Sequence, residues 1–194
     1  NSPFRSGRDL IERLRQDPYG PSFAVGSTLG SATHIAAALA IKAVGGDVRK
    51  MKAVVLNSSG DSVTQVLGGH IDVVTSAATL VLPHAQAGKL RMIGVAAAQR
   101  MSGALADVPT WKEQGVDANV PNWRAIIGPR GMSPEQIAYW EQVFARTVKT
   151  RAWQAEMERS LWQDIYAGSR ETRKFLDGEN AAMKLILSEL GLAK

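Results

Sequence analysis

Short apolar runs alternate with helix-length segments along residues 1–121, and this alternation constrains the fold more than any other feature of the sequence. The runs are bounded by Gly, Asn or Ser and predict strands at Phe23–Gly26, Ala53–Leu56, Ile71–Thr75 and Leu90–Val95. A helix is predicted from Ser31 to Val44, and a second is predicted to begin at an Asp61 N-cap. Strands and helices that alternate at this spacing predict an α/β fold with a parallel sheet.

The pattern changes after Pro121. Residues 122–129 predict one more strand, and a long helix is predicted to follow it. Ser133 as N-cap, Pro134 at the first helical position and Gln136 at the third together form a capping-box signature. Further helices are predicted over residues 150–159 and 169–190. We therefore place a boundary near residue 121 and expect two domains, residues 1–121 and 122–194.

The composition excludes several kinds of chemistry. The 194 residues include no cysteine, which excludes disulfides, thiolate nucleophiles and cysteine-bound metals. His34, His70 and His84 do not have the spacing of a metal site, and we expect neither a metal nor a cofactor. The net charge of +5 is spread along the chain, without the basic stripe and aromatic residues that nucleic-acid binding requires. We therefore expect no nucleic-acid partner, and a field that mildly attracts small anions.

A loop rich in glycine and hydroxyl groups lies between the first predicted strand and the first predicted helix. Unpaired backbone N–H groups and the positive end of the helix dipole make such a helix start suitable for a carboxylate or a phosphate. The glycines let a ligand approach the backbone, and the hydroxyl groups add donors. The residues concerned are Ser27, Thr28, Ser31 and Thr33, with Gly26 and Gly30. The alternative is that Ser31 only caps the helix and the glycines only make a turn.

Two further loops are predicted to meet the first one. Asn57 lies in the hydroxyl-rich stretch after the second strand, and Thr75 and Ser76 follow the third. Ligands of open parallel sheets settle at the carboxyl ends of the strands, where such loops converge. Ordinary turn chemistry is the alternative, because Asn, Ser, Gly and Asp dominate turns. His34 lies in the first turn of the helix, where it can contact the ligand or brace the loop.

The first loop lacks the motifs of common enzymes. It has no lysine after its second glycine, as a P-loop would, and no Gly-x-Gly-x-x-Gly or Gly-x-Ser-x-Gly spacing. The rival function is a hydrolase or acyl-transfer enzyme that uses Ser27 or Ser31 as nucleophile and His34 as base. No Asp or Glu is visibly placed to orient the imidazole, so we favour binding without catalysis.

Several short motifs, taken in order, resemble one protein family. They are Gly26-Ser27, Gly30-Ser31 with His34, Leu67-Gly-Gly-His-Ile-Asp72, Ala87-Gly-Lys-Leu-Arg91 leading to Arg100, Asp107-Val-Pro-Thr110 followed by Glu113 and Gly115, Trp123 with Gly128-Pro129, and Glu189-Leu-Gly-Leu192. Over essentially its whole length, the sequence resembles the substrate-binding proteins of tripartite tricarboxylate transporters, also called Bug-type solute receptors.

The resemblance implies a periplasmic binding protein type II-like fold, in which two α/β lobes close on a small carboxylate. Residues 1–121 would form one complete parallel-sheet lobe, the second lobe of the family, and residues 122–194 the C-terminal helical part of the first. A periplasmic location and membrane transporter subunits as partners are implied as well. The ligand-binding residues would be Ser27, Thr28, Gly30, Ser31, Thr33, His34, Asn57, Thr75 and Ser76.

The family's N-terminal portion, with its signal peptide and a further glycine-rich ligand loop, has no counterpart before Asn1. We therefore expect exposed apolar surface on the segment from Asn122 onward. Self-association, or pairing with a missing N-terminal portion, would cover that surface.

Overall fold

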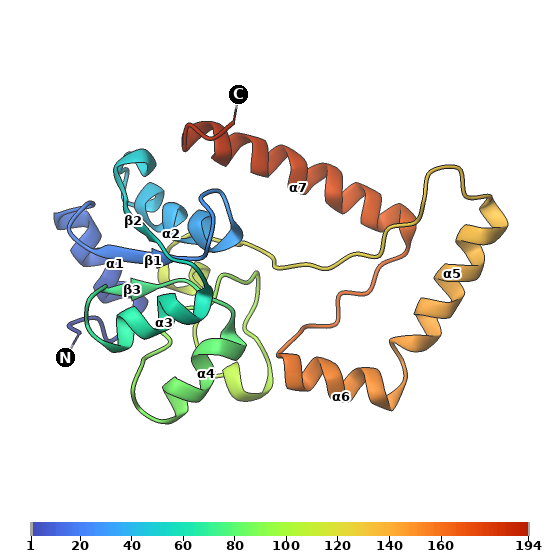
Figure 1. Cartoon of the computed structure of the whole chain (residues 1–194), viewed down its shortest axis with the longest axis horizontal. Helices are drawn as coiled ribbons and strands as arrows, with labels where there is room; N and C mark the ends of the chain where they lie inside the picture. Colours follow the sequence, from blue (N-terminus) through green and yellow to red (C-terminus); the bar gives the residue numbers. More distant parts are fainter. Residues whose placement is uncertain (1, 194) are drawn as a thin grey trace. The chain divides into compact units, whose positions relative to one another are not determined.

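The computed structural model of the chain describes residues 2–193, which form two compact units (Figure 1). Unit 1 comprises Asn1–Asn122 together with Ile186–Lys194, and unit 2 comprises Trp123–Leu185. The predicted domain of residues 122–194 differs from this division at its end, because residues 186–194 belong to unit 1.

Unit 1 is built on a three-stranded parallel sheet in the order β2-β1-β3. The strands are β1 (Ser22–Val25), β2 (Lys52–Val55) and β3 (Val73–Val74). Phe23 of β1 pairs with Ala53 on one side and with Val73 on the other, so β1 is the central strand. The predicted α/β fold with a parallel sheet is therefore confirmed.

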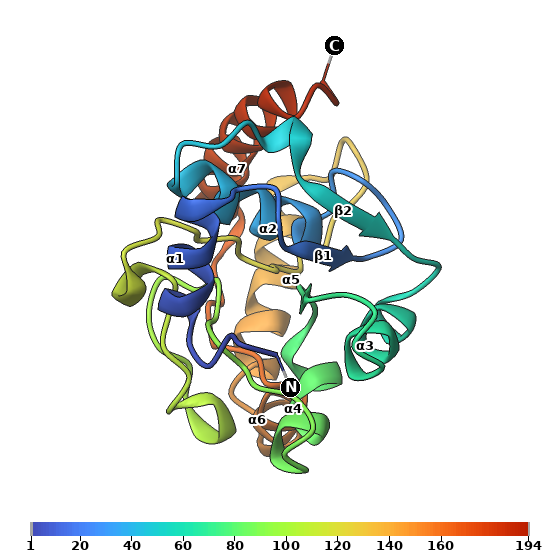
Figure 2. The same cartoon turned by 90° about the vertical axis from the view of Figure 1, so that its left-hand side faces the viewer.

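The helices α2 (Ala32–Ala43) and α3 (Ser59–Leu67) connect these strands. The first crossover runs from β1 to β2, and the second returns from β2 past β1 to β3. Because such crossovers are right-handed, opposite directions place the two helices on opposite faces of the sheet. Figure 2 shows α2 and α3 on opposite sides of β1. Two more helices, α1 (Gly7–Gln16) and α4 (Ala78–Gln86), were given no bounds by the sequence analysis.

Apolar side chains from α1, β1 and α2 form the core of unit 1. Leu10 and Leu14 of α1, Phe23 of β1, and Ile35 and Ile41 of α2 are each at most 2% exposed. Helix α1 begins with a capping box between Ser6 and Asp9, and α2 begins at an N-cap, Ser31. This core holds the strand and the helix on either side of the glycine-rich loop.

The start of α3 differs from the prediction. The N-cap is Ser58, whose Oγ accepts the backbone N–H of Asp61 at 3.1 Å, so Asp61 lies inside the first turn. The sequence alone did not decide between the two residues, because Ser and Asp are both preferred N-caps. Asp is also favoured in the first turn of a helix, which is where Asp61 lies.

The predicted strand at Leu90–Val95 is wrong, apart from one bridge between Val95 and Thr110. The Val95 N–H donates to the Pro109 carbonyl, and the Trp111 N–H donates to the Val95 carbonyl. The partner segment then turns into the 3₁₀-helix η3 (Lys112–Gln114), so the ladder cannot continue. Two further 3₁₀-helices, η1 (Val48–Lys50) and η2 (Gly103–Leu105), also belong to unit 1.

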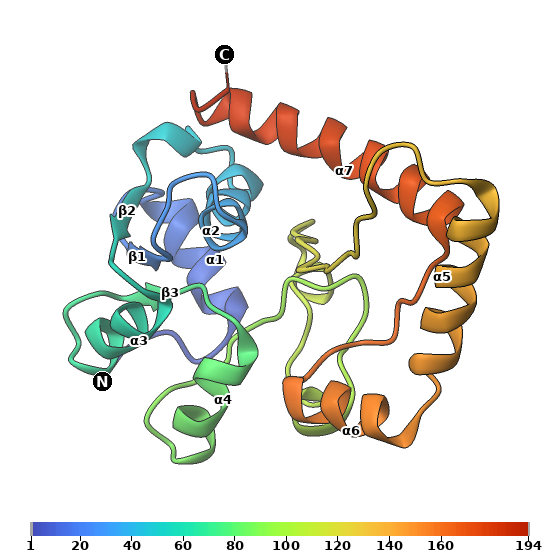
Figure 3. The ribbon, with the colours of Figure 1, turned by 45° about the vertical axis from the view of Figure 1, so that its right-hand side comes forward.

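Unit 2 consists of α5 (Pro134–Thr147), α6 (Arg151–Ser160) and most of α7 (Ser169–Glu189), joined by irregular segments (Figure 3). The capping box at Ser133 and Gln136 is confirmed, and Thr150 caps α6. The predicted strand at residues 122–129 is wrong, since the structure assigns none of these residues to a strand. A strand-forming sequence stays irregular when no neighbouring strand pairs with it. No second strand of the described residues covers the side chains of Ile126 and Ile127, which are 71% and 86% exposed.

Among residues 2–193, no helix has the length and apolarity that crossing a bilayer requires. The same residues contain no group of His, Cys, Asp and Glu side chains that could hold a metal ion.

Candidate anion-binding site

Three loops follow the carboxyl ends of the parallel strands. The β1–α2 loop covers residues 26–31, the β2–α3 loop residues 56–58, and the β3–α4 loop residues 75–77. Because the three strands are parallel, these loops lie along one edge of the sheet. All the residues predicted to bind a ligand lie in these loops or in the first turn of α2. Figure 2 shows the edge where β1 ends.

Hydroxyl groups of α2 hold the start of the β1–α2 loop. The Gly26 N–H donates to Oγ1 of Thr33 at 3.0 Å, and the same Oγ1 lies 3.0 Å from Oγ of Ser31. Ser31 Oγ also accepts the backbone N–H of His34 at 3.4 Å, as an N-cap does. A Cβ at Gly26 would lie 3.1 Å from Thr33 Oγ1, so a glycine allows this close approach. Thr33 and Ser31 therefore brace the loop from within.

The middle of the loop remains open to an incoming group. Ser27, Thr28 and Leu29 are exposed. Within the described part of the chain, their backbone N–H groups donate to no other group of the protein. The first N–H groups of a helix are also unpaired, and the positive end of the dipole of α2 lies here. This part of the loop can therefore donate several hydrogen bonds to one anion.

His34 braces the far end of the loop. The Gly30 N–H donates to Nδ1 of His34 at 2.9 Å, and the side chain is 5% exposed. Burial lowers the pKa of His34, so the imidazole is neutral near pH 7. Because Nδ1 accepts a hydrogen bond, the proton of the neutral ring lies on Nε2. Of the two roles considered for His34, the structure displays the bracing one.

The β3–α4 loop is tied to the same helix start. Thr75 Oγ1 donates to the Thr33 carbonyl at 2.7 Å, and the Thr75 N–H donates to the Ala24 carbonyl at 3.2 Å. The next residue, Ser76, has a buried Oγ with no hydrogen-bond partner among the described residues. Buried hydroxyl groups nearly always have a partner, so a bound molecule or a water is the expected partner of this atom. The structure thus brings Thr75 together with Thr33.

The β2–α3 loop contributes differently from what the sequence suggested. Asn57 is exposed, and its side chain forms no hydrogen bond to the other two loops, all of whose residues the structure describes. Ser62 Oγ instead donates to the carbonyl of Val25, where β1 ends, and Ser59 Oγ would lie 3.7 Å from a Cβ at Gly26. Neither serine was among the predicted site residues. Ser59 lies in the hydroxyl-rich stretch 56–61, and Ser62 directly follows it.

The three loops contain no Asp, Glu, Lys or Arg within residues 26–34, 56–60 and 75–78. An anion at this edge would therefore be held by neutral donors and by the helix dipole rather than by a salt bridge. No carboxylate in these segments would repel it.

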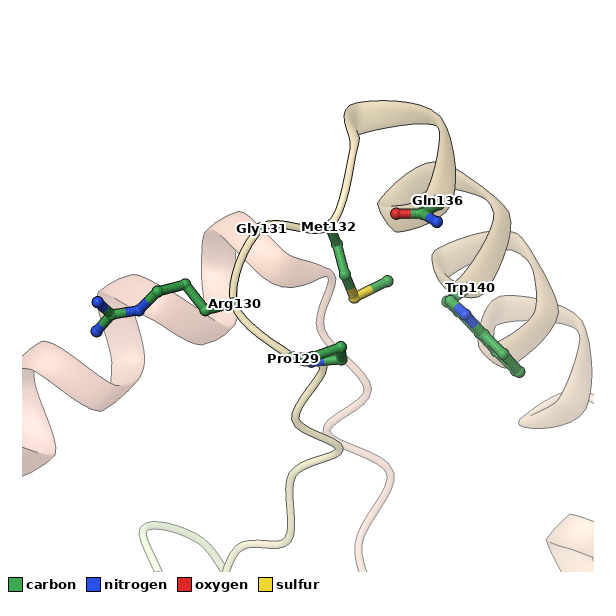
Figure 4. A pocket seen from close by; sticks show the side chains of 6 residues that line it. All are labelled: Pro129, Arg130, Gly131, Met132, Gln136 and Trp140. Atoms are coloured by element: carbon green, nitrogen blue, oxygen red, sulfur yellow. The ribbon is translucent and has the colours of Figure 1, made fainter.

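A separate hollow of about 290 Å³ lies in unit 2 at the start of α5 (Figure 4). Met132, Pro129, Gln136 and Trp140 line it, and the Arg130 side chain points away from it. None of the predicted ligand-binding residues lines this hollow.

A comparison with known proteins relates this chain to one protein family. Residues 1–192 match the model of the family described as "Tripartite tricarboxylate transporter family receptor". Protein BugT of Bordetella pertussis is 25% identical over 183 residues, which cover 94% of this chain and 55% of BugT. The chain thus spans little more than half the length of this relative.

Solved structures show the same fold. A TctC solute-binding protein from Polaromonas, without ligand, matches with a TM-score of 0.82 and 23% identity over 98% of this chain and 64% of its own. The R. palustris protein Rpa4515, solved with adipate, matches with a TM-score of 0.74 and 22% identity over 98% of this chain and 62% of its own. The predicted periplasmic binding protein-like fold is therefore confirmed.

Proposed function

Because the chain belongs to the tripartite tricarboxylate transporter receptor family, we propose that it captures a small carboxylate for uptake by a transporter of that kind. The β1–α2 loop carries this proposal. It combines the start of α2, the unpaired N–H groups of residues 27–29 and the absence of charged side chains. A carboxylate that accepts these hydrogen bonds also gains the field of the helix dipole.

A small organic acid with two or more carboxylates is the proposed class of ligand. Rpa4515 was solved with adipate, a linear dicarboxylate, and this chain shares its fold. One carboxylate would bind the β1–α2 loop, with Ser27 and Thr28 as further donors. Ser76 would satisfy its buried Oγ with the same molecule. Asn57, which is exposed at the neighbouring loop, would contact a longer ligand.

The arrangement of Ser31 and His34 supports ligand binding better than it supports the rival function, hydrolysis or acyl transfer. A base for a serine nucleophile needs a free ring nitrogen and a group that orients the ring. Nδ1 of His34 instead accepts the Gly30 N–H, and burial is the only cause of its lowered pKa. Ser31 Oγ is engaged by Thr33 and by the N–H of His34. We therefore propose a receptor that releases its ligand unchanged.

The whole receptor's setting is proposed with the function. Relatives of this family act with transporter subunits, so the proposed location is the periplasm and the proposed partner is the membrane transporter. A clamp binds tightly because two lobes donate to one desolvated ligand. We expect this chain alone, with one complete sheet lobe, to bind carboxylates no better than about millimolar, or about 4 kcal/mol.

A titration of Ser31→Ala with adipate, measured by calorimetry, tests the proposal. The hydroxyl is expected to contribute through the loop that it braces, and its loss should weaken binding by about 1 to 2 kcal/mol. Ser133→Ala is the matched control, because it removes an N-cap of the same type from α5 in unit 2. Equal affinities of all three proteins would assign Ser31 to capping alone. Hydrolysis of carboxylate esters by the unmodified chain would favour the rival function.

A further inference from the structure

The last turn of α7 ends in a sharply defined cap within unit 1. Gly191 has a positive φ of 70°, the Leu192 N–H donates to the Leu187 carbonyl at 2.8 Å, and the Gly191 N–H donates to the Ser188 carbonyl at 2.9 Å. This pair of hydrogen bonds around a left-handed residue is a Schellman motif. It folds Leu192 back beside Leu187. We call residues 187–192 the C-terminal turn.

The C-terminal turn packs on the β1–α2 loop. A Cβ at Gly30 would lie 3.1 Å from Cδ2 of Leu187 and 3.5 Å from Cδ1 of Leu192, so both leucines lie against this glycine. Gly30 itself has a positive φ of 80°, and its N–H is held by His34. A side chain at residue 30 would be strained by its backbone, and its Cβ would make a tight contact with Leu187.

Two further contacts fix the turn on unit 1. Lys42 Nζ, in the last turn of α2, lies 2.7 Å from both carboxylate oxygens of Glu189. Ile186 and Leu190 are 6% and 8% exposed. The turn is therefore anchored to α2 by an ion pair and to the core by buried side chains, while Leu187 and Leu192 contact Gly30 of the loop from one side.

From these contacts we infer that the C-terminal turn positions the β1–α2 loop for anion binding, although about 160 residues separate the two in sequence. Leu187 and Leu192 hold Gly30 in its left-handed conformation from one side while His34 holds its N–H from the other. A loop fixed before the ligand arrives loses less conformational entropy on binding. The inference rests on the proposed function, and it assigns a positioning role to residues that do not touch the ligand.

Leu192 is the residue to change, because it is 44% exposed and its loss leaves the buried part of the core intact. Leu192→Ala is compared with Leu185→Ala, which truncates a 61% exposed leucine in the part of α7 that belongs to unit 2. Leu192→Met serves as the conservative variant, because methionine can refill the contact with Gly30. All variants are made in the whole chain.

Amide hydrogen exchange, read by NMR, tests whether the turn holds the loop. In Leu192→Ala, the Gly30 amide should exchange about fivefold faster, while Ala24 in β1 and Ile41 in α2 keep their protection. Leu192→Met should restore the Gly30 protection, and Leu185→Ala should leave it unchanged. No change at Gly30, or an equal loss at all three amides, would overturn the inference.

Titration with adipate, followed by the Gly30 and Ser31 amide signals, tests the link to binding. Leu192→Ala should weaken the dissociation constant about fivefold relative to the unmodified chain and to Leu185→Ala. An unchanged dissociation constant would refute the positioning role. If adipate and citrate shift no loop signal in the unmodified chain, the proposed function fails and its link to the turn fails with it. The exchange result alone still decides whether the turn holds the loop.

Discussion

The two units differ in what surrounds their apolar residues. In unit 1, Phe23 and Ile35 are buried between a sheet and its helices. In residues 123–185 of unit 2, Met157 is the one hydrophobic side chain counted as buried, while Ile127 and Ile165 are 86% and 63% exposed. Helix α2 in unit 1 and helix α5 in unit 2 both begin at a serine N-cap. Local signals therefore suffice to form helices, but burying an apolar face requires a second layer.

The difference predicts a large gap in stability between core positions. Phe23→Ala should destabilise unit 1 by about 3 to 5 kcal/mol, because it removes a fully buried aromatic side chain and leaves a cavity. Ile127→Ala should change the free energy of unfolding by less than about 0.5 kcal/mol, because the side chain is exposed. Urea unfolding followed by NMR signals of each unit measures both. A comparable loss for the two variants would remove the contrast between the units.

The exposed apolar surface of unit 2 predicts self-association of this chain. Replacing both Ile126 and Ile127 with lysine should lower the association constant at least about tenfold, since burying one isoleucine contributes roughly 1.5–3 kcal/mol. Sedimentation velocity over a range of concentrations gives the constant. Leu80→Lys, at a 44% exposed position of unit 1, is the control. A monodisperse monomer of the unmodified chain, with cooperative unfolding, would show that unit 2 needs no partner.

Sequence reasoning succeeded where a signal is local. The capping box at Ser133 and Gln136 fixed the start of α5, and the glycine-rich stretch from Gly26 located the open loop. Two predicted strands failed, because the same β-branched pattern forms a strand only beside a partner. Residues 122–129 have no such partner in the described chain.

Of the inner contacts of the site, the sequence predicted only the bracing of the loop by His34, as one of two alternatives. Two acceptors of loop N–H groups, Thr33 Oγ1 and His34 Nδ1, depend on side-chain orientation. The packing of Leu192 on Gly30 joins residues far apart in the sequence, although both belong to unit 1. That contact follows from tertiary structure, and no spacing in the sequence encodes it.

The smallest expected effect concerns pH. Burial lowers the pKa of His34 in the folded chain, so the folded state disfavours the protonated ring. Below the unfolded value of about 6.5, the unfolded chain binds a proton that the folded chain does not. Stability should therefore fall as the pH drops from about 6.5 through the folded pKa.

Urea midpoints between pH 7.5 and 5 measure this fall, and His34→Gln should reduce its slope. His70→Gln, at an exposed position, is the control and should keep the slope of the unmodified chain. If both variants keep the same slope, other groups cause the pH dependence and His34 has no special role in unit 1.

An NMR titration of the unmodified chain with adipate and citrate tests carboxylate binding by the β1–α2 loop most directly. The amide signals of Ser27, Thr28, Leu29 and Ser31 should shift together, with a dissociation constant of about millimolar. Signals from α5 and the hollow beside Met132 and Trp140 should stay in place. Shifts confined to unit 2, or no shift in the β1–α2 loop at saturating ligand, would contradict the claim that this loop binds the carboxylate.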